Sequence, residues 1–97
     1  MSRLIYISGK ISGATEEELA DFQLSETMLR GKGWQVVNPM KLNHDHDLSW
    51  ESYMRVDIKA ICDCDAMYML SNYKQSRGAT LEHLIAKALN LEMIYQD

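Results

Sequence analysis

Residues 68–89 decide the fold of this chain, and they read Tyr68-Met-Leu-Ser-Asn-Tyr-Lys-Gln-Ser-Arg-Gly-Ala-Thr-Leu-Glu-His-Leu-Ile-Ala-Lys-Ala-Leu89. The apolar run 66–70 enters this stretch and leads into a polar loop. Apolar side chains then recur at i, i+3, i+4, i+7 and i+8, the spacing of one helix face. They are Leu81, Leu84, Ile85, Ala88 and Leu89. The pattern predicts a strand, a loop and a helix in succession.

Three residues of this unit could build a ligand site. Ser76 offers a hydroxyl before the helix, Gly78 lets the backbone approach a ligand closely, and Glu82 falls in or near the first helical turn. The positive end of a helix favours an ionised carboxylate there. Glu82 is therefore a candidate nucleophile, and the alternative is that it only complements the helix dipole.

The rest of the chain repeats the alternation of strand and helix. The expected strands are 4–7, 34–37, 66–70 and 91–95, and the expected helices are about 15–31, 50–61 and the segment after Gly78. Four strands alternating with three helices indicate a three-layer α/β fold of the Rossmann or flavodoxin type. We expect a parallel four-stranded sheet of order 2-1-3-4 with helices on both faces, in a single domain covering residues 1–97.

Composition limits the classes of function. The chain has 97 residues, a net charge of −4 and 46% apolar residues, which is typical of a soluble globular domain. No apolar run approaches the roughly 18 residues of a membrane span, and no export signal is evident, so we expect a cytoplasmic protein without membrane contact. No basic cluster is present, which argues against binding a nucleic acid polymer. So short a chain builds a modest core, and we expect a homo-oligomer, a dimer or higher.

Two clusters could suggest a metal, and neither is assigned one. Cys62 and Cys64 are spaced for neither a disulfide framework nor a four-ligand zinc site, so we expect free thiols. The run 44–47, His-Asp-His-Asp, reads as a solvated loop, because adjacent side chains point to opposite sides. The sequence thus predicts no metal and no cofactor.

Asp57 is the most informative single position. It falls within the apolar stripe of the helix expected over 50–61. A carboxylate in a buried stripe is costly unless it is paired, hydrogen-bonded or facing a cleft. Ligands of open parallel sheets bind beyond the carboxyl ends of the strands, where strand order reverses. We therefore expect loops 8–13 and 71–78 to converge with Asp57 and Glu82 at one crevice.

These residues together resemble a known superfamily. Tyr6-Ile-Ser-Gly-Lys-Ile-Ser-Gly13, Asp57 in a helix, and Ser76-Arg-Gly-Ala-Thr-Leu-Glu82 resemble the nucleoside 2-deoxyribosyltransferases, including their hydrolase branch, the 2'-deoxynucleoside 5'-phosphate N-hydrolases. The chain is most similar overall to the DUF4406-type domain. The resemblance covers nearly the whole chain.

The resemblance implies a role for each matching residue. Glu82 would attack the anomeric carbon of a deoxyribosyl group, Asp57 would give the departing base a proton or hydrogen bond, and Tyr6 would orient the nucleophile. Substrate-binding residues would come from both loops. They are Ser8, Gly9, Lys10, Ser76 and Gly78.

Two positions depart from the family pattern. Ser76 stands where the transferases have an aspartate, which favours the phosphate-recognising branch, and Lys10 stands where that branch has a serine and could pair with phosphate instead. Both branches also complete their sites with C-terminal residues of a neighbouring subunit, and this sequence ends at Asp97. Three interpretations stay open: an N-glycosidic-bond enzyme acting on a nucleoside or nucleotide, a non-catalytic nucleotide-binding module such as a phage protein, or a structural domain.

Overall fold

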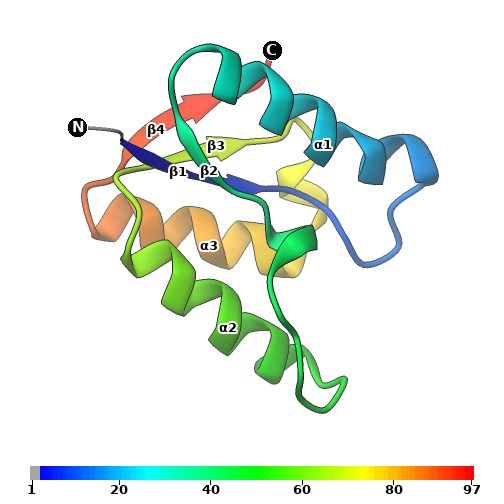
Figure 1. The fold of residues 1–97 in the computed structure, drawn as a ribbon. Coiled ribbons are helices and arrows are strands. Elements are labelled where there is room, and N and C mark those ends of the chain that lie inside the picture. Colours follow the sequence, from blue (N-terminus) through cyan, green and yellow to red (C-terminus); the bar gives the residue numbers. More distant parts are fainter. Residues whose placement is uncertain (1–2) are drawn as a thin grey trace.

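The computed structural model describes residues 3–97. This part of the chain forms four strands, three α-helices and two short 3-10 helices (Figure 1). In chain order they are β1 (Leu4–Ser8), α1 (Glu16–Gly31), β2 (Gln35–Val37), η1 (Pro39–Lys41), α2 (Trp50–Cys62), β3 (Ala66–Met69), η2 (Tyr73–Gln75), α3 (Arg77–Ala88) and β4 (Glu92–Tyr95). The expected elements are all present, and the strands differ from expectation by about one residue at their ends.

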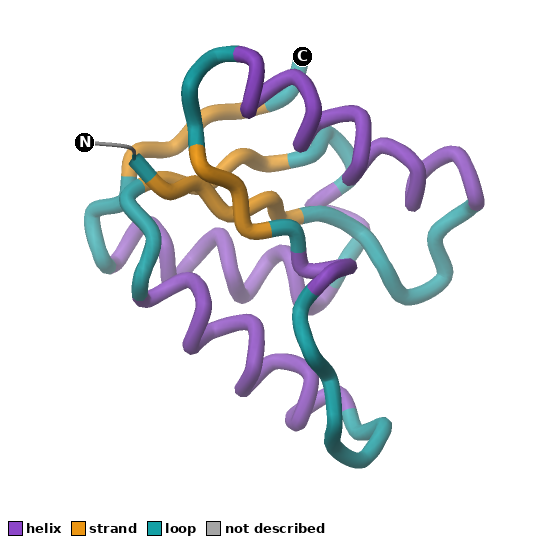
Figure 2. The backbone as a smooth tube through the Cα atoms, in the orientation of Figure 1, coloured by secondary structure: helices purple, strands orange, loops and turns teal. Residues whose placement is uncertain are grey.

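The strands form one parallel sheet of order β2-β1-β3-β4, which confirms the predicted topology. β1 lies in the middle, where Tyr6 pairs with Val37 on one side and Met67 on the other. The loops that follow β1 and β3 leave the same end of the sheet (Figure 2). Loops that are far apart in the sequence are thereby brought together at that end.

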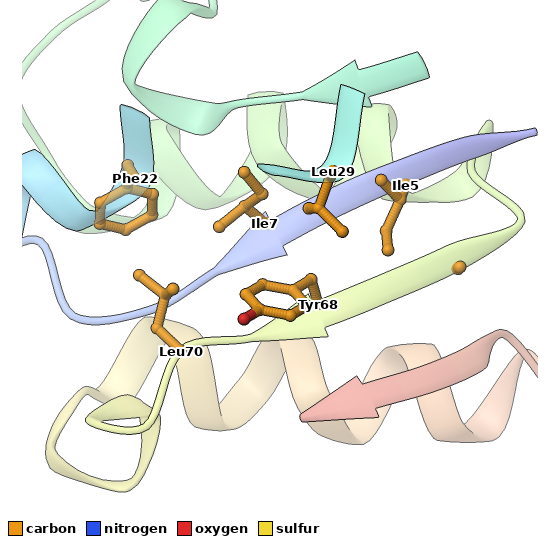
Figure 3. Packing of buried hydrophobic residues seen from close by; sticks show 7 residues of the cluster. Ile5, Ile7, Phe22, Leu29, Tyr68 and Leu70 are labelled. Carbon is orange, nitrogen blue, oxygen red and sulfur yellow. The ribbon is translucent and has the colours of Figure 1, made fainter. Parts of the chain in front are cut away.

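Helices cover both faces of the sheet. α1 lies against one face, and α2 and α3 lie against the other (Figure 1). On the α1 face, Phe22 and Leu29 pack against Ile5 and Ile7 of β1 and against the end of β3 (Figure 3). Side chains alternate along a strand, so the β1 residues that follow Ile5 and Ile7 point to the other face of the sheet. They are Tyr6 and Ser8.

Helix starts are fixed by side-chain caps. Thr15 and Glu18 form a capping box at α1, Ser49 caps α2, and Ser76 caps α3 by accepting a hydrogen bond from the Ala79 amide. Since α3 begins at Arg77, Glu82 lies in its second turn, and the first turn carries no acidic residue. The expected helix-dipole contact of Glu82 is therefore weak, because the effect falls off within the first turn.

The helices of residues 3–97 do not combine the length and apolarity that crossing a membrane requires.

Candidate active site

A cleft of about 620 Å³ opens at the carboxyl end of β1 and β3. The loop after β1 lines it with Gly9 and Ile11, and the start of α3 lines it from the opposite side. α2 supplies one wall, mostly apolar, with Tyr53 and Met54. The cleft occupies the position expected for a ligand site in an open parallel sheet.

Glu82 lies at the inner end of this cleft with only 4% of its surface exposed. Its Oε1 accepts a hydrogen bond of 2.7 Å from the Ser8 hydroxyl, and its Oε2 accepts one of 3.2 Å from the Tyr6 hydroxyl. Both donors are fully buried on the same face of β1. The strand therefore fixes the orientation of the Glu82 carboxyl group.

Asp57 faces the same cleft from α2 and is 6% exposed. Its Oδ1 atom is buried and accepts no hydrogen bond among the described residues. The ring of His44 lies beside it, with 3.4 Å between its Nε2 atom and that oxygen. A buried carboxyl oxygen without a donor is costly as an anion, which favours a proton on Asp57 or a donor supplied by a ligand.

The two carboxyl groups interact with each other and titrate as a pair. Burial raises the pKa of Glu82 to about 8; hydrogen bonds from Ser8 and Tyr6 oppose this shift, and Asp57 adds to it. Burial also raises the pKa of Asp57 to about 6. Between these values the pair holds one proton. Burial and then Glu82 raise the pKa of Tyr6 well above its usual value, so this phenol stays a neutral donor.

Two glycines beside the cleft, Gly9 and Gly78, are closely packed. A Cβ atom on Gly9 would lie 2.6 Å from Leu70 Cδ1, and one on Gly78 would lie 3.2 Å from Met54 Sδ. Gly78 thus lets the start of α3 approach α2, and both glycines line the cleft.

Three of the residues expected to bind substrate make hydrogen bonds within the protein. Ser76 caps α3 and also lines the cleft. Ser8 is buried beneath Glu82, and neither Ser8 nor Lys10 is among the residues that line the cleft. The Lys10 amide instead donates to Asn72 Oδ1 at 3.1 Å, which ties the two loops together.

Sequence reasoning missed two residues at this site, Arg77 and His44. Arg77 lines the cleft and stacks its guanidinium over the Trp50 ring, with 3.6 Å between Cζ and the ring centroid. Arg77 is the middle residue of the Ser-x-Gly motif, so its position in the motif could have indicated that it lies at the site. His44, from the 44–47 run, contacts Asp57. Within residues 3–97, no three His, Cys, Asp or Glu side chains converge in a way that could hold a metal ion.

The fold is shared with a known enzyme. A solved structure of 2-deoxyribosyltransferase from the psychrotolerant bacterium Bacillus psychrosaccharolyticus superposes with a TM-score of 0.75 over 95% of this chain and 70% of that one, at 22% sequence identity. At this identity the likeness shows a common fold. No curated protein sequence gives a significant match. The family model described as Domain of unknown function (DUF4406) matches residues 3–95, almost the full chain, and this protein therefore belongs to the DUF4406 family.

Proposed function

We propose that this protein cleaves or transfers the N-glycosidic bond of a deoxynucleoside or its 5'-monophosphate, with Glu82 as the nucleophile. One observation carries the proposal: a buried carboxyl group, held by the Tyr6 and Ser8 hydroxyls, faces a second carboxyl group in a cleft. The fold common to this chain and a 2-deoxyribosyltransferase supports it, as do the matching motifs around Tyr6 and Glu82.

In the first step the Glu82 carboxylate attacks the anomeric carbon. The C–N bond breaks, its electron pair goes to the departing base, and the base takes the proton of Asp57. The sugar is then held as an ester on Glu82. A single proton in the carboxyl pair serves both needs, because placing it on Asp57 creates the acid and leaves Glu82 ionised.

In the second step Asp57, now ionised, takes a proton from the attacking molecule. Water gives hydrolysis, and the N–H of an acceptor base gives transfer. Attack at the anomeric carbon breaks the ester and restores the Glu82 carboxylate, with the proton again on Asp57. The pair thus returns to its starting state without any other proton carrier.

The cleft walls suit the two ends of such a substrate. Trp50, Tyr53 and Met54 offer an apolar wall for a flat base. Arg77 and the start of α3 offer positive charge and amide donors for a hydroxyl or phosphate group.

We also expect the protein to associate with itself, as a dimer or higher. Large apolar side chains are exposed along and beside α3, among them Leu84, Leu89 and Tyr95. Light scattering at micromolar concentration tests this expectation, and a monomer would contradict it.

The second candidate function is a nucleotide-binding module without chemistry. It is favoured by the burial of Glu82, which raises the pKa of this carboxyl group to about 8, because a protonated Glu82 donates a hydrogen bond and does not attack. Such a site would hold a nucleoside and release it unchanged.

The deciding experiment incubates the protein with each deoxynucleoside and each 5'-monophosphate and measures free base by chromatography. We expect base release by the parent protein, none by Glu82→Gln, and parent-like release by the control Glu17→Gln, whose side chain is exposed on α1. Calorimetry should show that Glu82→Gln still binds the substrate. Binding without base release in the parent protein would favour the module, and unchanged turnover in Glu82→Gln would refute Glu82 as the nucleophile.

A further inference from the structure

A chain of hydrogen-bonding groups runs from the loop before α2 to Asp57. The Nδ1 atom of His46 contacts the carbonyl oxygen of Asp47, and the Nε2 atom of His46 lies 2.7 Å from Nδ1 of His44. The other nitrogen of His44, Nε2, lies 3.4 Å from Asp57 Oδ1. Both rings pack on Tyr53, with centroids 4.6 and 4.7 Å from the Tyr53 ring centroid, so their orientation is fixed by packing.

The chemistry of the groups gives this chain a direction. A carbonyl oxygen only accepts, so His46 Nδ1 carries the hydrogen in the first contact. In a neutral His46 the Nε2 atom is then an acceptor, so the hydrogen of the second contact belongs to His44 Nδ1. A neutral His44 therefore turns a lone pair toward Asp57 Oδ1. Burial and the neighbouring His46 lower the pKa of His44 and outweigh a hydrogen bond to the Pro39 backbone that raises it, which favours this neutral ring over a charged one.

Two lone pairs facing each other across 3.4 Å are satisfied only by a proton between them. Asp57 Oδ1 accepts no hydrogen bond among residues 3–97, so a proton on this oxygen gives the atom its one partner there. We infer that His44 is a positioning residue that keeps the single proton of the carboxyl pair on Asp57 and leaves Glu82 ionised. The inference concerns the resting protein, and only its consequence for catalysis rests on the proposed function.

The hydrogen-bonding groups beside the pair favour this placement, and they act against the deeper burial of Glu82, which raises its pKa to about 8 and above that of Asp57. From β1, the Tyr6 and Ser8 hydroxyls both point hydrogens at Glu82, which favours negative charge on that carboxyl group. From the loop before α2, His44 presents an acceptor to Asp57. Placing the proton on Glu82 instead would set an anionic Asp57 oxygen against the lone pair of His44. The charge of His46, when that ring is protonated, would act the other way and lower the pKa of Asp57.

The arrangement can be tested on the free protein, without any substrate. We would label histidine with ¹⁵N and the Asp and Glu carboxyl groups with ¹³C, and record spectra at about pH 7.5, where free imidazole is neutral. We expect His44 in the neutral form with hydrogen on Nδ1, the Asp57 carboxyl signal at the position of a protonated acid, and the Glu82 signal at that of a carboxylate. Hydrogen on His44 Nε2, or an ionised Asp57 beside a protonated Glu82, would overturn the inference.

Two variants separate positioning from packing. His44→Leu fills the space but offers no acceptor, so the shared proton should move to Glu82. The Glu82 signal should then be that of a protonated acid and the Asp57 signal that of a carboxylate. His44→Gln can place an amide oxygen near the position of Nε2 and should restore the parent pattern. A His44→Leu protein that is folded and keeps the proton on Asp57 would refute the role of His44.

Base-release assays then separate this inference from the proposed function. If the protein is the proposed enzyme, His44→Leu should lower kcat at least tenfold with a smaller change in KM, and His44→Gln should recover most of it. If no base is released, the NMR result still decides where the proton lies, and only the proposed function fails.

Discussion

The Ser8 hydroxyl donates a hydrogen bond of 2.7 Å to Glu82 Oε1 across 74 positions of sequence. Ser8 is fully buried at the end of β1, so its hydroxyl has no water as an alternative partner. Glu82 projects from the second turn of α3 onto the same face of the sheet. The contact therefore joins the central strand to the helix that carries the candidate nucleophile.

Replacing Ser8 by alanine removes this donor at a small change in volume. Because the Ser8 hydrogen bond lowers the pKa of Glu82, the pKa should rise further in Ser8→Ala. The buried acceptor that is left unsatisfied should cost about 1–3 kcal/mol of unfolding free energy. Carboxyl NMR titration and urea unfolding measure the two effects. Ser71→Ala, at an exposed position after β3, is the matched control and should change neither quantity.

The pH dependence of stability should report the buried carboxyl pair. Whichever of its two carboxyl groups holds the proton, the folded pair keeps it up to the higher pKa of about 8, whereas the unfolded value for a glutamate lies near 4.5, so the pair binds more protons in the folded state between these values. Its contribution to stability is present below about pH 4.5 and is lost as the pH rises toward 8, at up to about 1.4 kcal/mol per pH unit for one proton. The lowered pKa values of His44 and His83 act in the opposite sense.

Urea unfolding at several pH values between about 5 and 8 isolates the Glu82 term when the parent protein is compared with Glu82→Gln. Their difference in unfolding free energy should shift steadily in favour of the variant as the pH rises. Glu26 stays ionised throughout this range. Burial raises the pKa of Glu26, but hydrogen bonds from Arg30, Lys41 and Asn38 outweigh burial and lower it to about 2. Parallel pH curves for the two proteins would show that the folded carboxyl pair holds no extra proton across this range.

Regular periodicity made most of the fold predictable. The apolar spacing after Gly78 indicated α3, and the alternation of strands and helices indicated a parallel sheet, for which 2-1-3-4 is a common strand order. Asp57 could be expected at the cleft because burying a carboxylate within an apolar helix face is costly unless it faces a cleft or a hydrogen-bonding partner. The role of Ser8 was also within reach, since side chains two apart on a strand share a face, which puts Ser8 beside Tyr6.

The missed contacts come from segments without periodicity. The loop 44–47 was interpreted as solvated because adjacent side chains alternate, yet the same alternation puts His44 and His46 on one side, where both stack on Tyr53. Nothing local specifies where such a loop packs, because its position depends on the N-terminal end of α2. The family resemblance suggested that Lys10 could pair with a phosphate, and no local pattern indicated that its backbone amide is held by Asn72 in the loop after β3.

Replacing Gly9 or Gly31 by alanine should change the free energy of unfolding by different amounts. In Gly9→Ala the new Cβ would meet Leu70 at 2.6 Å, inside the packed core, and should cost about 1–3 kcal/mol of unfolding free energy. Gly31 ends α1 at an exposed position with nothing within 4 Å of a new Cβ, so Gly31→Ala should be neutral or stabilise by up to about 1 kcal/mol. Thermal and urea unfolding measure both. Equal effects would contradict the close approach of Gly9 to the end of β3.

Arg77 and Lys10 offer a direct test of where a phosphate would bind. Arg77 lines the cleft beside the Ser76 cap of α3, whereas Lys10 is not among the residues that line it. If the substrate carries a 5'-phosphate, Arg77→Gln should raise KM or Kd for the monophosphate about 10–100-fold, since hydrogen bonds to charged groups contribute about 1.5–3 kcal/mol. The same variant should affect the unphosphorylated deoxynucleoside much less. Lys10→Gln, which removes a charge of the same sign from the neighbouring loop, should leave both ligands nearly unaffected. A larger loss in Lys10→Gln than in Arg77→Gln would assign the phosphate to the loop after β1 instead.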